Sequence, residues 1–373
     1  MPSVMLDARH LGSRQSGIGR YTSDLFRALA LLRPDLALRL LVRKPGDEGA
    51  LAADRVARFD AWPYGLRSTL LLPRCLGPEP ADLFHSTYHV LPRGLGCATV
   101  MTLHDLIAFE GAQGSLRPFP VWCAEYAFFR VAIPESLRRA HRIVAVSRAT
   151  ADEVAARFPF CRDKLRIVHH GVRPEFRPCD DRPAAERRAA VLAGPAPFVL
   201  ALGGLSPNKN QAGMLRAFAA ARAASPTTRM VIVARYGERR RIVELARRLG
   251  VGAHLVVLPH LCDPDLRALL HTATCLAFCS RVEGFGLPLL EAMACGCPVL
   301  TSNRSAMAEV AGDAALLADP DDVADMARQM RRMLCLPDLR RELALRGLER
   351  ARGFTWQRCA ALTAAVYDEA LGL

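Results

Sequence analysis

The segment 280–303, S-R-V-E-G-F-G-L-P-L-L-E-A-M-A-C-G-C-P-V-L-T-S-N, constrains the fold most, because it contains both ends of a helix and a following strand. Pro288 suits the first position of a helix, and Gly296 suits the residue just after its end. The residues between them supply an apolar helical face, and 298–301 read as a strand that is buried on both sides. The segment therefore predicts a loop, a short helix and a strand in a parallel α/β domain.

The loop of this segment has the chemistry of an anion and hydroxyl site. Gly284 and Gly286 let the backbone approach a ligand where the free N–H groups of the helix start favour phosphate or sugar oxygens. Glu283 lies in the loop and Glu291 one turn into the helix, so both can face one bound molecule. A carboxylate beside a diphosphate is unfavourable, so the pair is better suited to accepting hydrogen bonds from sugar hydroxyls.

At these residues the chain resembles the retaining nucleotide-sugar glycosyltransferases of family 4, which have the GT-B fold. The family signature is E-G-F-G-L-P at a first glutamate and E-A-x-A-x-G-x-P-V at a second one, and both halves stand here, at 283–288 and 291–299. The resemblance implies an α/β protein with two Rossmann-like β/α/β domains facing across a cleft. The alternative is that the two glutamates simply lie on a solvated turn and helix.

Length and composition agree with two domains. A chain of 373 residues, 51% of them hydrophobic, is too long for one ordinary core and can bury two sheets. The sequence has no run of about 18 apolar residues, and 1–6 pass straight into a strand-like pattern without a basic region and cleavage site. We therefore expect a cytoplasmic protein.

The domain boundaries are expected from shifts in composition. We expect 1–172 to form one domain and 173–352 a second one that opens with a linker rich in Pro, Arg and Asp. The resemblance implies that the first is a Rossmann-like acceptor-binding domain and the second a Rossmann-like nucleotide-sugar-binding domain. In the resembled family a last helix, here 353–373, crosses back onto the first domain. An apolar stripe supports this expectation and consists of Trp356, Leu362 and Tyr367.

Cysteines and acidic pairs do not indicate a metal. The twelve cysteines are scattered and lie mostly in apolar segments, so most are expected to be small buried hydrophobic residues. Asp263 and Asp265 match a D-x-D pattern, but Asp263 as N-cap and Pro264 as first helical residue make an ordinary helix start. We expect no cofactor and no metal dependence, with cationic side chains and helix N-termini stabilising the departing diphosphate.

The net charge of +13 implies attraction to polyanions, yet no nucleic-acid module accompanies it, so no nucleic-acid partner is expected. Almost all cations are Arg, and Lys209 stands in a glycine-containing turn, A-L-G-G-L-S-P-N-K-N, between a strand from Phe198 and a helix. The resemblance implies that Lys209 neutralises the donor diphosphate, with Gly203 and Asn208 in the same turn. An ordinary structural turn is the alternative.

This turn departs from the family at one position. The family often has an Arg right after the first glycine, where this chain has Gly204. Either another arginine substitutes, with Arg235 and Arg281 as candidates, or donor binding is weaker.

The first half of the chain carries a second set of signals. After a strand at 4–6, Gly17 and Gly19 lie where a loop meets a helix, and the resemblance of G-I-G-R-Y to the family implies that this loop covers the donor phosphates. Arg20 and Arg14 are candidate anion contacts, with solvated surface arginines as the alternative. The dinucleotide fingerprint is incomplete in both halves, which disfavours an NAD dehydrogenase.

Polar residues follow two predicted strands of the first half. His104 and Asp105 end one strand, and the resemblance implies that His104 contacts the transferred sugar near its anomeric centre; a core histidine bonded to a backbone carbonyl is the alternative. His85 and Tyr88 follow the preceding strand and are expected on the acceptor side, together with Arg20 and Asp105.

The resemblance implies a division of roles within the donor site. Glu291 accepts the ribose hydroxyls, Lys209 meets the phosphates, and Glu283 holds a sugar hydroxyl. Backbone amides near Phe285, Gly286 and Leu287 hold sugar and phosphate oxygens. The implied reaction retains the anomeric configuration by departure and attack on the same face.

The opening L-D-A-R with G-I-G-R-Y resembles bacterial enzymes of O-antigen and capsule synthesis, which implies mannosyl transfer from GDP-mannose first and UDP-linked sugars second. The acceptor would be a glycan or a lipid-linked oligosaccharide. A lipid-linked acceptor would bring the protein to the inner face of the anionic cytoplasmic membrane, where the aromatic and basic segment 119–142 would suit an interface, although core packing is the commoner fate of such aromatics. A sugar-nucleotide epimerase and a non-catalytic sugar-nucleotide-binding protein are the alternatives.

Overall fold

The computed structural model describes residues 1–373 except 13–16, 52, 77–80, 110–118 and 235–236. It divides into two compact units, and we describe each by itself. The N-terminal unit comprises Met1–Ala112, Arg117–Gly171 and Thr355–Leu373, and the C-terminal unit contains Val172–Phe354.

The N-terminal unit is built on a seven-stranded parallel sheet of order β3-β2-β1-β4-β5-β6-β7. Its strands are β1 Ser3–Asp7, β2 Ala37–Val42, β3 Arg55–Arg58, β4 Leu83–Ser86, β5 Ala98–Leu103, β6 Arg142–Ala145 and β7 Leu165–Ile167. Its helices are α1 Gly17–Leu32, α2 Leu66–Cys75, α3 Phe119–Arg139, α4 Arg148–Arg157 and α13 Trp356–Leu371. Two hydrophobic clusters cover the two faces of the sheet, one with α1 and α13 and the other with α2, α3 and α4.

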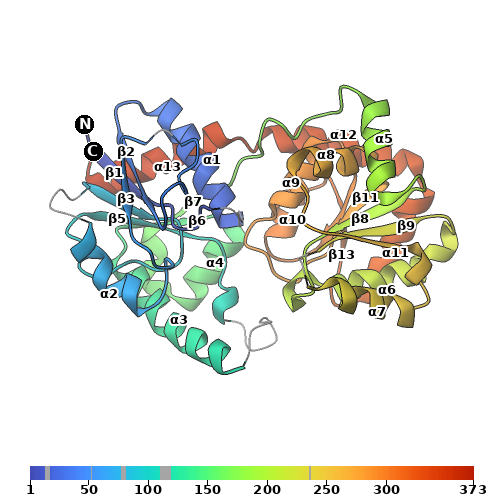
Figure 1. Ribbon diagram of the computed structural model, residues 1–373, viewed down its shortest axis with the longest axis horizontal. Coiled ribbons are helices and arrows are strands. Elements are labelled where there is room, and N and C mark those ends of the chain that lie inside the picture. The colour runs from blue at the N-terminus through green and yellow to red at the C-terminus, as the bar shows by residue number, and fades with distance from the viewer. Residues whose placement is uncertain (13–16, 52, 77–80, 110–118, 235–236) are drawn as a thin grey trace. The chain divides into compact units, whose positions relative to one another are not determined.

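The C-terminal unit has a six-stranded parallel sheet of order β10-β9-β8-β11-β12-β13. Its strands are β8 Phe198–Leu202, β9 Arg229–Val233, β10 Leu255–Leu258, β11 Cys275–Phe278, β12 Val299–Ser302 and β13 Leu316–Ala318. Its helices are α5 Arg182–Ala193, α6 Gln211–Ala221, α7 Arg239–Arg248, α8 Asp263–Thr272, α9 Leu287–Ala294, α10 Ser305–Ala311, α11 Val323–Cys335 and α12 Pro337–Arg352. Figure 1 shows α6, α7 and α11 on one face of this sheet and α5, α8, α9 and α12 on the other.

Both sheets have the strand order of a Rossmann fold, so the predicted fold class is confirmed. Strand β12 is buried along its whole length, as its apolar sequence predicts. The carboxyl ends of parallel strands lie at one edge of a sheet, which is where ligands bind in such folds. Every site residue predicted from a strand end therefore belongs to one of these two edges.

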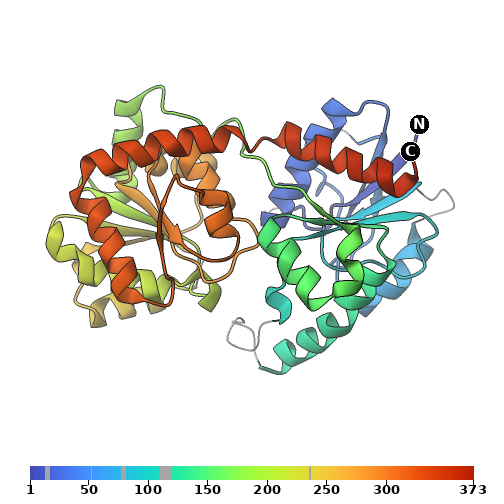
Figure 2. The ribbon, with the colours of Figure 1, turned by 180° about the vertical axis from the view of Figure 1, so that it is seen from behind.

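Helix α13 returns the chain to the N-terminal unit and packs beside α1 (Figure 2). Trp356 and Tyr367 are buried in the cluster that α1 shares, but Leu362 is 40% exposed. The prediction that Leu362 belongs to the apolar stripe is therefore wrong, because the buried face repeats through Cys359, Ala360, Thr363 and Ala364 instead.

Two helix starts lie one residue earlier than the sequence predicts. Helix α8 begins at Asp263 with Cys262 as its N-cap, so Asp263 is not the cap. Helix α9 begins at Leu287, so Pro288 is its second residue, and Gly296 follows the helix with a φ of 72° as expected. Ser147 caps α4, because its side chain accepts a hydrogen bond from the Thr150 amide.

Among the described residues, no helix combines the length and the apolar character that crossing a membrane requires. Helix α3, which contains the aromatic and basic segment, buries Phe129 and packs Phe128 partly against the core. Val121 and Val131 of the same helix are exposed, at 46% and 65%. Core packing therefore explains the presence of Phe128 and Phe129 in α3.

Candidate functional site

The turn after β8 is shaped around Lys209. Gly203 adopts a φ of 114°, which favours glycine, and its amide donates to the Val233 carbonyl at 3.0 Å. A Cβ atom on Gly203 would lie 3.3 Å from Cδ of Lys209, so the glycine lets the backbone run beside the lysine stem. The side-chain amide of Gln211 donates to the Gly203 carbonyl at 3.1 Å and holds the turn from α6.

Lys209 and Glu283 meet in an ion pair, with Nζ 2.6 Å from Oε1. They are far apart in the sequence, but they follow β8 and β11, which are neighbouring strands. The side chains are 28% and 13% exposed, so both are only partly accessible to solvent. Two of the predicted site residues are therefore brought together at the carboxyl edge of this sheet.

The loop before α9 has no space for larger residues. Gly286 has a φ of 101°, and a Cβ atom there would lie 2.3 Å from the Met307 methyl group. Gly284 and Phe285 are buried beside it, and α9 begins directly afterwards at Leu287. The amides of this first turn precede the helical hydrogen-bond ladder, so they can bind an anion or a sugar oxygen.

Glu291 is buried at 6% exposure, one turn into α9. Sequence reasoning missed a residue that supports the first glutamate: the Ser305 hydroxyl donates to the Glu283 carbonyl at 2.7 Å. Ser305 begins α10 and has a φ of 56°, which is rare for a residue with a side chain. Its signal in the sequence is weak, because a serine at the start of a helix is ordinary capping chemistry.

The Glu238 carboxylate fills the space beside Gly204, the position at which the family often has an arginine. A Cβ atom on Gly204 would lie 2.3 Å from Oε2 of Glu238, and Oε1 of Glu238 accepts from the Leu205 amide at 3.0 Å. Of the two arginines predicted to compensate, Arg281 pairs with Asp321 at 2.7 Å and donates to the Pro207 carbonyl at 2.8 Å. The second, Arg235, lies outside the described residues.

The Asn208 backbone carbonyl accepts a hydrogen bond from the Arg281 amide at 2.7 Å. The partly buried side chain of Asn208 belongs to the same turn as Lys209. Asn210, which no motif indicated, is buried and donates to the carbonyls of Cys279 and Pro320 at 3.2 and 2.6 Å. The turn is therefore anchored to its own unit on both sides of Lys209.

In the N-terminal unit His104 is buried, and its Nε2 donates to the Thr87 carbonyl at 3.1 Å. This is the bond expected of a core histidine. Burial, with a smaller effect of His89, lowers the pKa of His104 to about 3, so the ring is neutral near pH 7. A neutral ring with a proton on Nε2 has Nδ1 as a hydrogen-bond acceptor.

The assignment of His85 to the acceptor side is corrected. His85 is fully buried, and its two ring nitrogens bond to the Tyr367 hydroxyl at 2.7 Å and the Thr102 hydroxyl at 2.8 Å. It therefore joins α13 to the sheet and has no surface for a ligand. Tyr88 is partly exposed, and Asp105 caps the next turn by accepting from the Ile107 amide at 3.0 Å.

Gly17 and Gly19 lie in the first turn of α1, the former exposed and the latter buried, and Arg20 follows partly buried. Arg14 lies outside the described residues. The structure places Gly17, Gly19 and Arg20 after β1, at the carboxyl edge of the N-terminal sheet.

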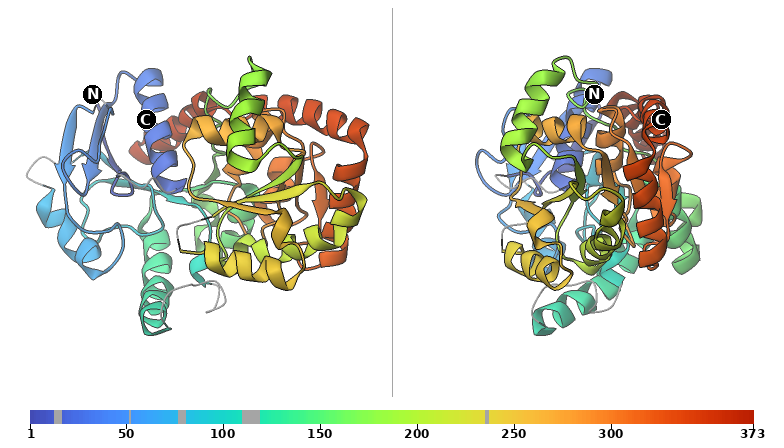
Figure 3. Two further views of the ribbon diagram at one scale, coloured as in Figure 1. Left: turned by 45° about the vertical axis from the view of Figure 1, so that its right-hand side comes forward. Right: turned by 90° about the vertical axis from the view of Figure 1, so that its right-hand side faces the viewer.

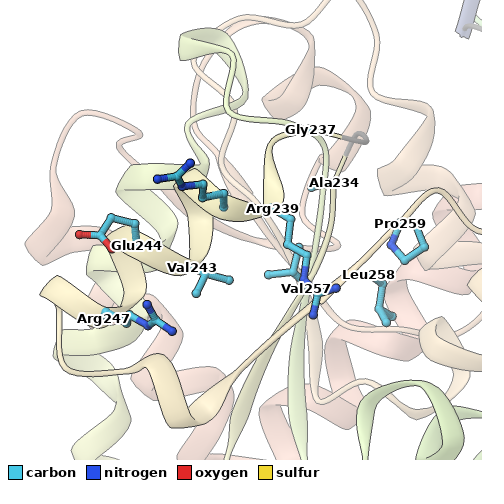
Figure 4. A pocket seen from close by; sticks show the side chains of 10 residues that line it. Ala234, Gly237, Arg239, Val243, Glu244, Arg247, Val257, Leu258 and Pro259 are labelled. Atoms are coloured by element: carbon cyan, nitrogen blue, oxygen red, sulfur yellow. The ribbon is translucent and has the colours of Figure 1, made fainter.

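A pocket of about 900 Å³ opens beside α7, at the carboxyl ends of β9 and β10 (Figure 4). Arg239, Arg240 and Arg247 line it, with Val243 and Val257 as apolar wall. None of the predicted site residues in the described part of the chain lines this pocket. The left view of Figure 3 shows the unit with α7 toward the front.

The D-x-D carboxylates are both engaged by arginines. Asp263 pairs with Arg173 at 2.8 Å and Asp265 with Arg188 at 2.6 Å. Among the described residues, no cluster of three or more His, Cys, Asp or Glu side chains is arranged to hold a metal ion. All twelve cysteines are free thiols. Six of them are buried, so the expectation of buried hydrophobic residues holds for half of them, and Cys75, Cys262 and Cys335 are exposed.

Two family models match the chain. The one described as glycosyl transferases group 1 covers residues 184–350, and the one described as Glycosyltransferase Family 4 covers residues 15–176. Together with two Rossmann units and the paired glutamate motif, these matches define the class: the chain belongs to the GT-B glycosyltransferases of family 4.

Among characterised proteins, the chain is similar to O-antigen chain mannosyltransferase B of Escherichia coli. The two are 28% identical over 383 residues, which span 94% of this chain and 96% of the relative. It is also 30% identical over 271 residues to the serotype-specific mannosyltransferase WbdA of Escherichia coli, covering 71% of this chain and 32% of that protein. The D-inositol 3-phosphate glycosyltransferase of Salinispora tropica is 31% identical over 78% of this chain and 64% of its own.

Solved structures share the fold. Sucrose-phosphate synthase from Thermosynechococcus elongatus superposes with a TM-score of 0.76 at 21% identity over 100% of both chains. WaaG, a glycosyltransferase involved in lipopolysaccharide biosynthesis, has a TM-score of 0.74 at 16% identity, also over 100% of both chains. At such identities the likeness establishes the GT-B fold alone.

Proposed function

We propose that the protein is a retaining mannosyltransferase, which moves mannose from GDP-mannose to a glycan or lipid-linked acceptor in surface polysaccharide synthesis. The observation that carries the proposal is the Lys209–Glu283 pair at the start of α9. It stands in a chain that resembles an O-antigen mannosyltransferase along almost its whole length. The proposed reaction needs no metal or other cofactor.

In the proposed complex the donor diphosphate binds Lys209 and backbone amides at the start of α9. A phosphate would compete with Glu283 for the lysine, which frees this carboxylate to accept a hydrogen bond from a sugar hydroxyl. Glu291 accepts the ribose hydroxyls. His104, through Nδ1, contacts the transferred sugar.

The bond between the anomeric carbon and the phosphate oxygen breaks, and a bond to the acceptor oxygen forms on the same face of the sugar. The acceptor proton passes to a donor phosphate oxygen, so the products are the glycosylated acceptor and the nucleoside diphosphate. Lys209 and the helix amides stabilise the charge on the leaving group.

The nucleotide is tested with a thermal-shift panel of GDP-, UDP-, ADP- and TDP-sugars. We expect GDP-mannose to raise the melting temperature most. On the best donor, Lys209→Ala and Glu291→Ala should each weaken binding by more than about 1 kcal/mol, the scale of one charge-assisted hydrogen bond. Lys44→Ala, which changes an exposed lysine of the N-terminal unit, is the matched control.

Two outcomes would contradict the proposal. Isomerised donor without transfer would indicate an epimerase, and binding without turnover in the presence of acceptors would indicate a non-catalytic protein. An anomeric configuration inverted in the product would contradict retention alone.

If the acceptor is lipid-linked, we propose peripheral contact with anionic membranes through the basic surface implied by the net charge of +13. Co-sedimentation with anionic vesicles should then weaken as salt is raised. Equal recovery with neutral and anionic vesicles would argue against this contact.

A further inference from the structure

Aromatic side chains gather at the carboxyl edge of the N-terminal sheet, in the loops that follow three of its strands. His10 follows β1, Trp62 and Tyr64 follow β3, and Tyr88 follows β4. The ring centroids of Trp62 and Tyr64 are 6.4 Å apart at 20°, and His10 lies 6.0 Å from Trp62 and 4.8 Å from Tyr88. We call these four side chains the aromatic platform.

The platform is open to solvent at Trp62, which is 49% exposed. The Arg43 guanidinium lies over its ring, 4.1 Å from the centroid, and also reaches Asp60 at 3.4 Å. Arg43 covers one face of the Trp62 ring, so a ligand that is apolar on one face and polar at its edges would stack on the other face, with charged groups beside it. A pyranose ring has this character, since its C–H bonds form a face and its hydroxyls an edge.

Polar atoms beneath and beside the platform have no protein partner. Among the described residues, Nε2 of His10, Nδ1 of His89 and Nε of Arg43 are buried without a hydrogen bond. His89 is 5% exposed, and its ring lies 4.0 Å from that of Tyr88. Buried polar groups are normally satisfied by protein or by ordered water, so these three atoms are positions at which ligand hydroxyls could bond.

The unpartnered imidazoles are suited to hydroxyl groups. Burial lowers the pKa of His10 to about 4 and the pKa of His89 to about 3, so both rings are neutral near pH 7. A neutral imidazole presents one donor and one acceptor nitrogen, which match the donor and acceptor of a sugar hydroxyl.

We propose that the aromatic platform is a saccharide-binding subsite that holds a pyranose ring of the acceptor glycan. The ring stacks its C–H face on Trp62, and its hydroxyls bond to His10, His89 and Arg43. This inference rests on the proposed glycosyltransfer for the role of the saccharide as acceptor, but the binding of a saccharide at Trp62 is measurable without turnover.

The binding test uses the protein labelled with 5-fluorotryptophan and fluorine NMR. The chain has three tryptophans, Trp62, Trp122 and Trp356, so three signals are expected, and the signal that disappears in Trp62→Phe is that of Trp62. Methyl α-D-mannopyranoside, mannotriose and maltotriose are titrated in separate arms. We expect at least one of them to shift the Trp62 signal saturably while the Trp356 signal stays in place.

The functional test compares variants in acceptor-dependent transfer. Trp62→Ala should raise the acceptor KM about tenfold, which corresponds to about 1.4 kcal/mol, and Trp62→Phe should recover most of the loss because it keeps an aromatic face. Phe160→Ala is the matched control, since Phe160 is 46% exposed in the same unit and has the Arg138 guanidinium 4.7 Å from its ring centroid. It should leave the KM unchanged.

A Trp62 signal that no saccharide shifts would overturn the inference, as would a signal that moves with anionic vesicles or with GDP but with none of the three sugars. The proposed function fails separately, through the donor panel. Saccharide binding at Trp62 without any donor binding would support the subsite and leave the glycosyltransfer unsupported. Donor binding without saccharide binding would support the glycosyltransfer and overturn the subsite.

Discussion

Gly204 has no room for a side chain, although its backbone has an ordinary conformation. A Cβ atom there would lie 2.3 Å from the Glu238 carboxylate, which is fixed by its bond to the Leu205 amide. The family's arginine at this position would need the carboxylate to move or to pair with it. The departure from the family is thus accompanied by a second residue, Glu238, that no motif indicated.

We expect Gly204→Ala to lower the free energy of unfolding by about 1–3 kcal/mol, the usual cost of overpacking. Urea denaturation measures this loss. In the Gly204→Ala, Glu238→Ala double variant the cost should be smaller than the sum of the single changes, because the clash is gone. Gly96→Ala is the control, since nothing lies within 4 Å of a Cβ there, and its effect should stay within about 0.5 kcal/mol.

The Ser305 hydroxyl donates a hydrogen bond of 2.7 Å to the Glu283 carbonyl and so holds the loop before α9. If the proposed reaction is correct, Ser305→Ala should lower kcat and leave the acceptor KM unchanged, because Ser305 positions the glutamate loop and touches no substrate. The matched change Ser225→Ala removes a partly buried hydroxyl pair with Thr228, in a turn that does not contact Glu283, and should alter neither constant. A rise in acceptor KM with unchanged kcat would contradict this role.

At the residue scale, motif spacing predicted Lys209 and Glu283, because their chemistry requires particular neighbours on each side in the sequence. The prediction for His85 was wrong, because a histidine near the end of a strand, here within β4, has the same local sequence whether it faces a ligand or a helix from far along the chain. The partner of His85 is Tyr367, which is 282 positions away. Such a pairing has no local signal.

Among the helices and strands, α13 is the one whose place depends most clearly on tertiary structure. Its buried face completes the core of a unit whose other elements end before residue 172. A glycine allows the close approach, since a Cβ on Gly171 would lie 2.2 Å from the Trp356 amide nitrogen. The hydrogen bond from Tyr367 to His85 fixes the far half of the helix.

We expect Tyr367→Phe to destabilise the N-terminal unit by about 1–3 kcal/mol, because it leaves a nitrogen of fully buried His85 unpaired. Tryptophan fluorescence during urea unfolding measures this directly, since all three tryptophans lie in this unit. Tyr126→Phe, which removes a hydroxyl from the partly exposed surface of α3, should leave the midpoint unchanged.

Over the whole molecule, the two units differ in their buried histidines. Burial lowers the pKa of five histidines of the N-terminal unit, namely His10, His85, His89, His104 and His170. In the C-terminal unit the described residues include one such case, His271, which is less deeply buried. The units should therefore respond differently to acid.

The direction in which the stability of the N-terminal unit changes with pH follows from proton binding. As the pH falls through about 6.5, the histidines of the unfolded chain take up protons, whereas His10, His85, His89 and His104 in the folded unit take them up only near pH 3–4. Burial lowers the pKa of His170 in the same direction. The stability of the N-terminal unit should fall by up to about 1.4 kcal/mol per pH unit for each histidine. The tryptophan fluorescence midpoint in urea reports the unfolding of the N-terminal unit, and far-UV circular dichroism also records the unfolding of the C-terminal unit. From pH 7 to 5.5 the first midpoint should fall more than the midpoint of the C-terminal unit. Equal falls of the two midpoints would contradict this prediction.

The sequence by itself determined the class of fold, the family and the loop-helix-strand motif, because strand hydrophobicity, helix ends and glycine spacing are local properties that neighbouring residues reveal. Tertiary structure alone decided that Lys209 meets Glu283, that Glu238 fills the space beside Gly204, and that His85 binds Tyr367. These contacts join residues from different strands and helices. Their geometry depends on strand order and packing, which no local pattern specifies.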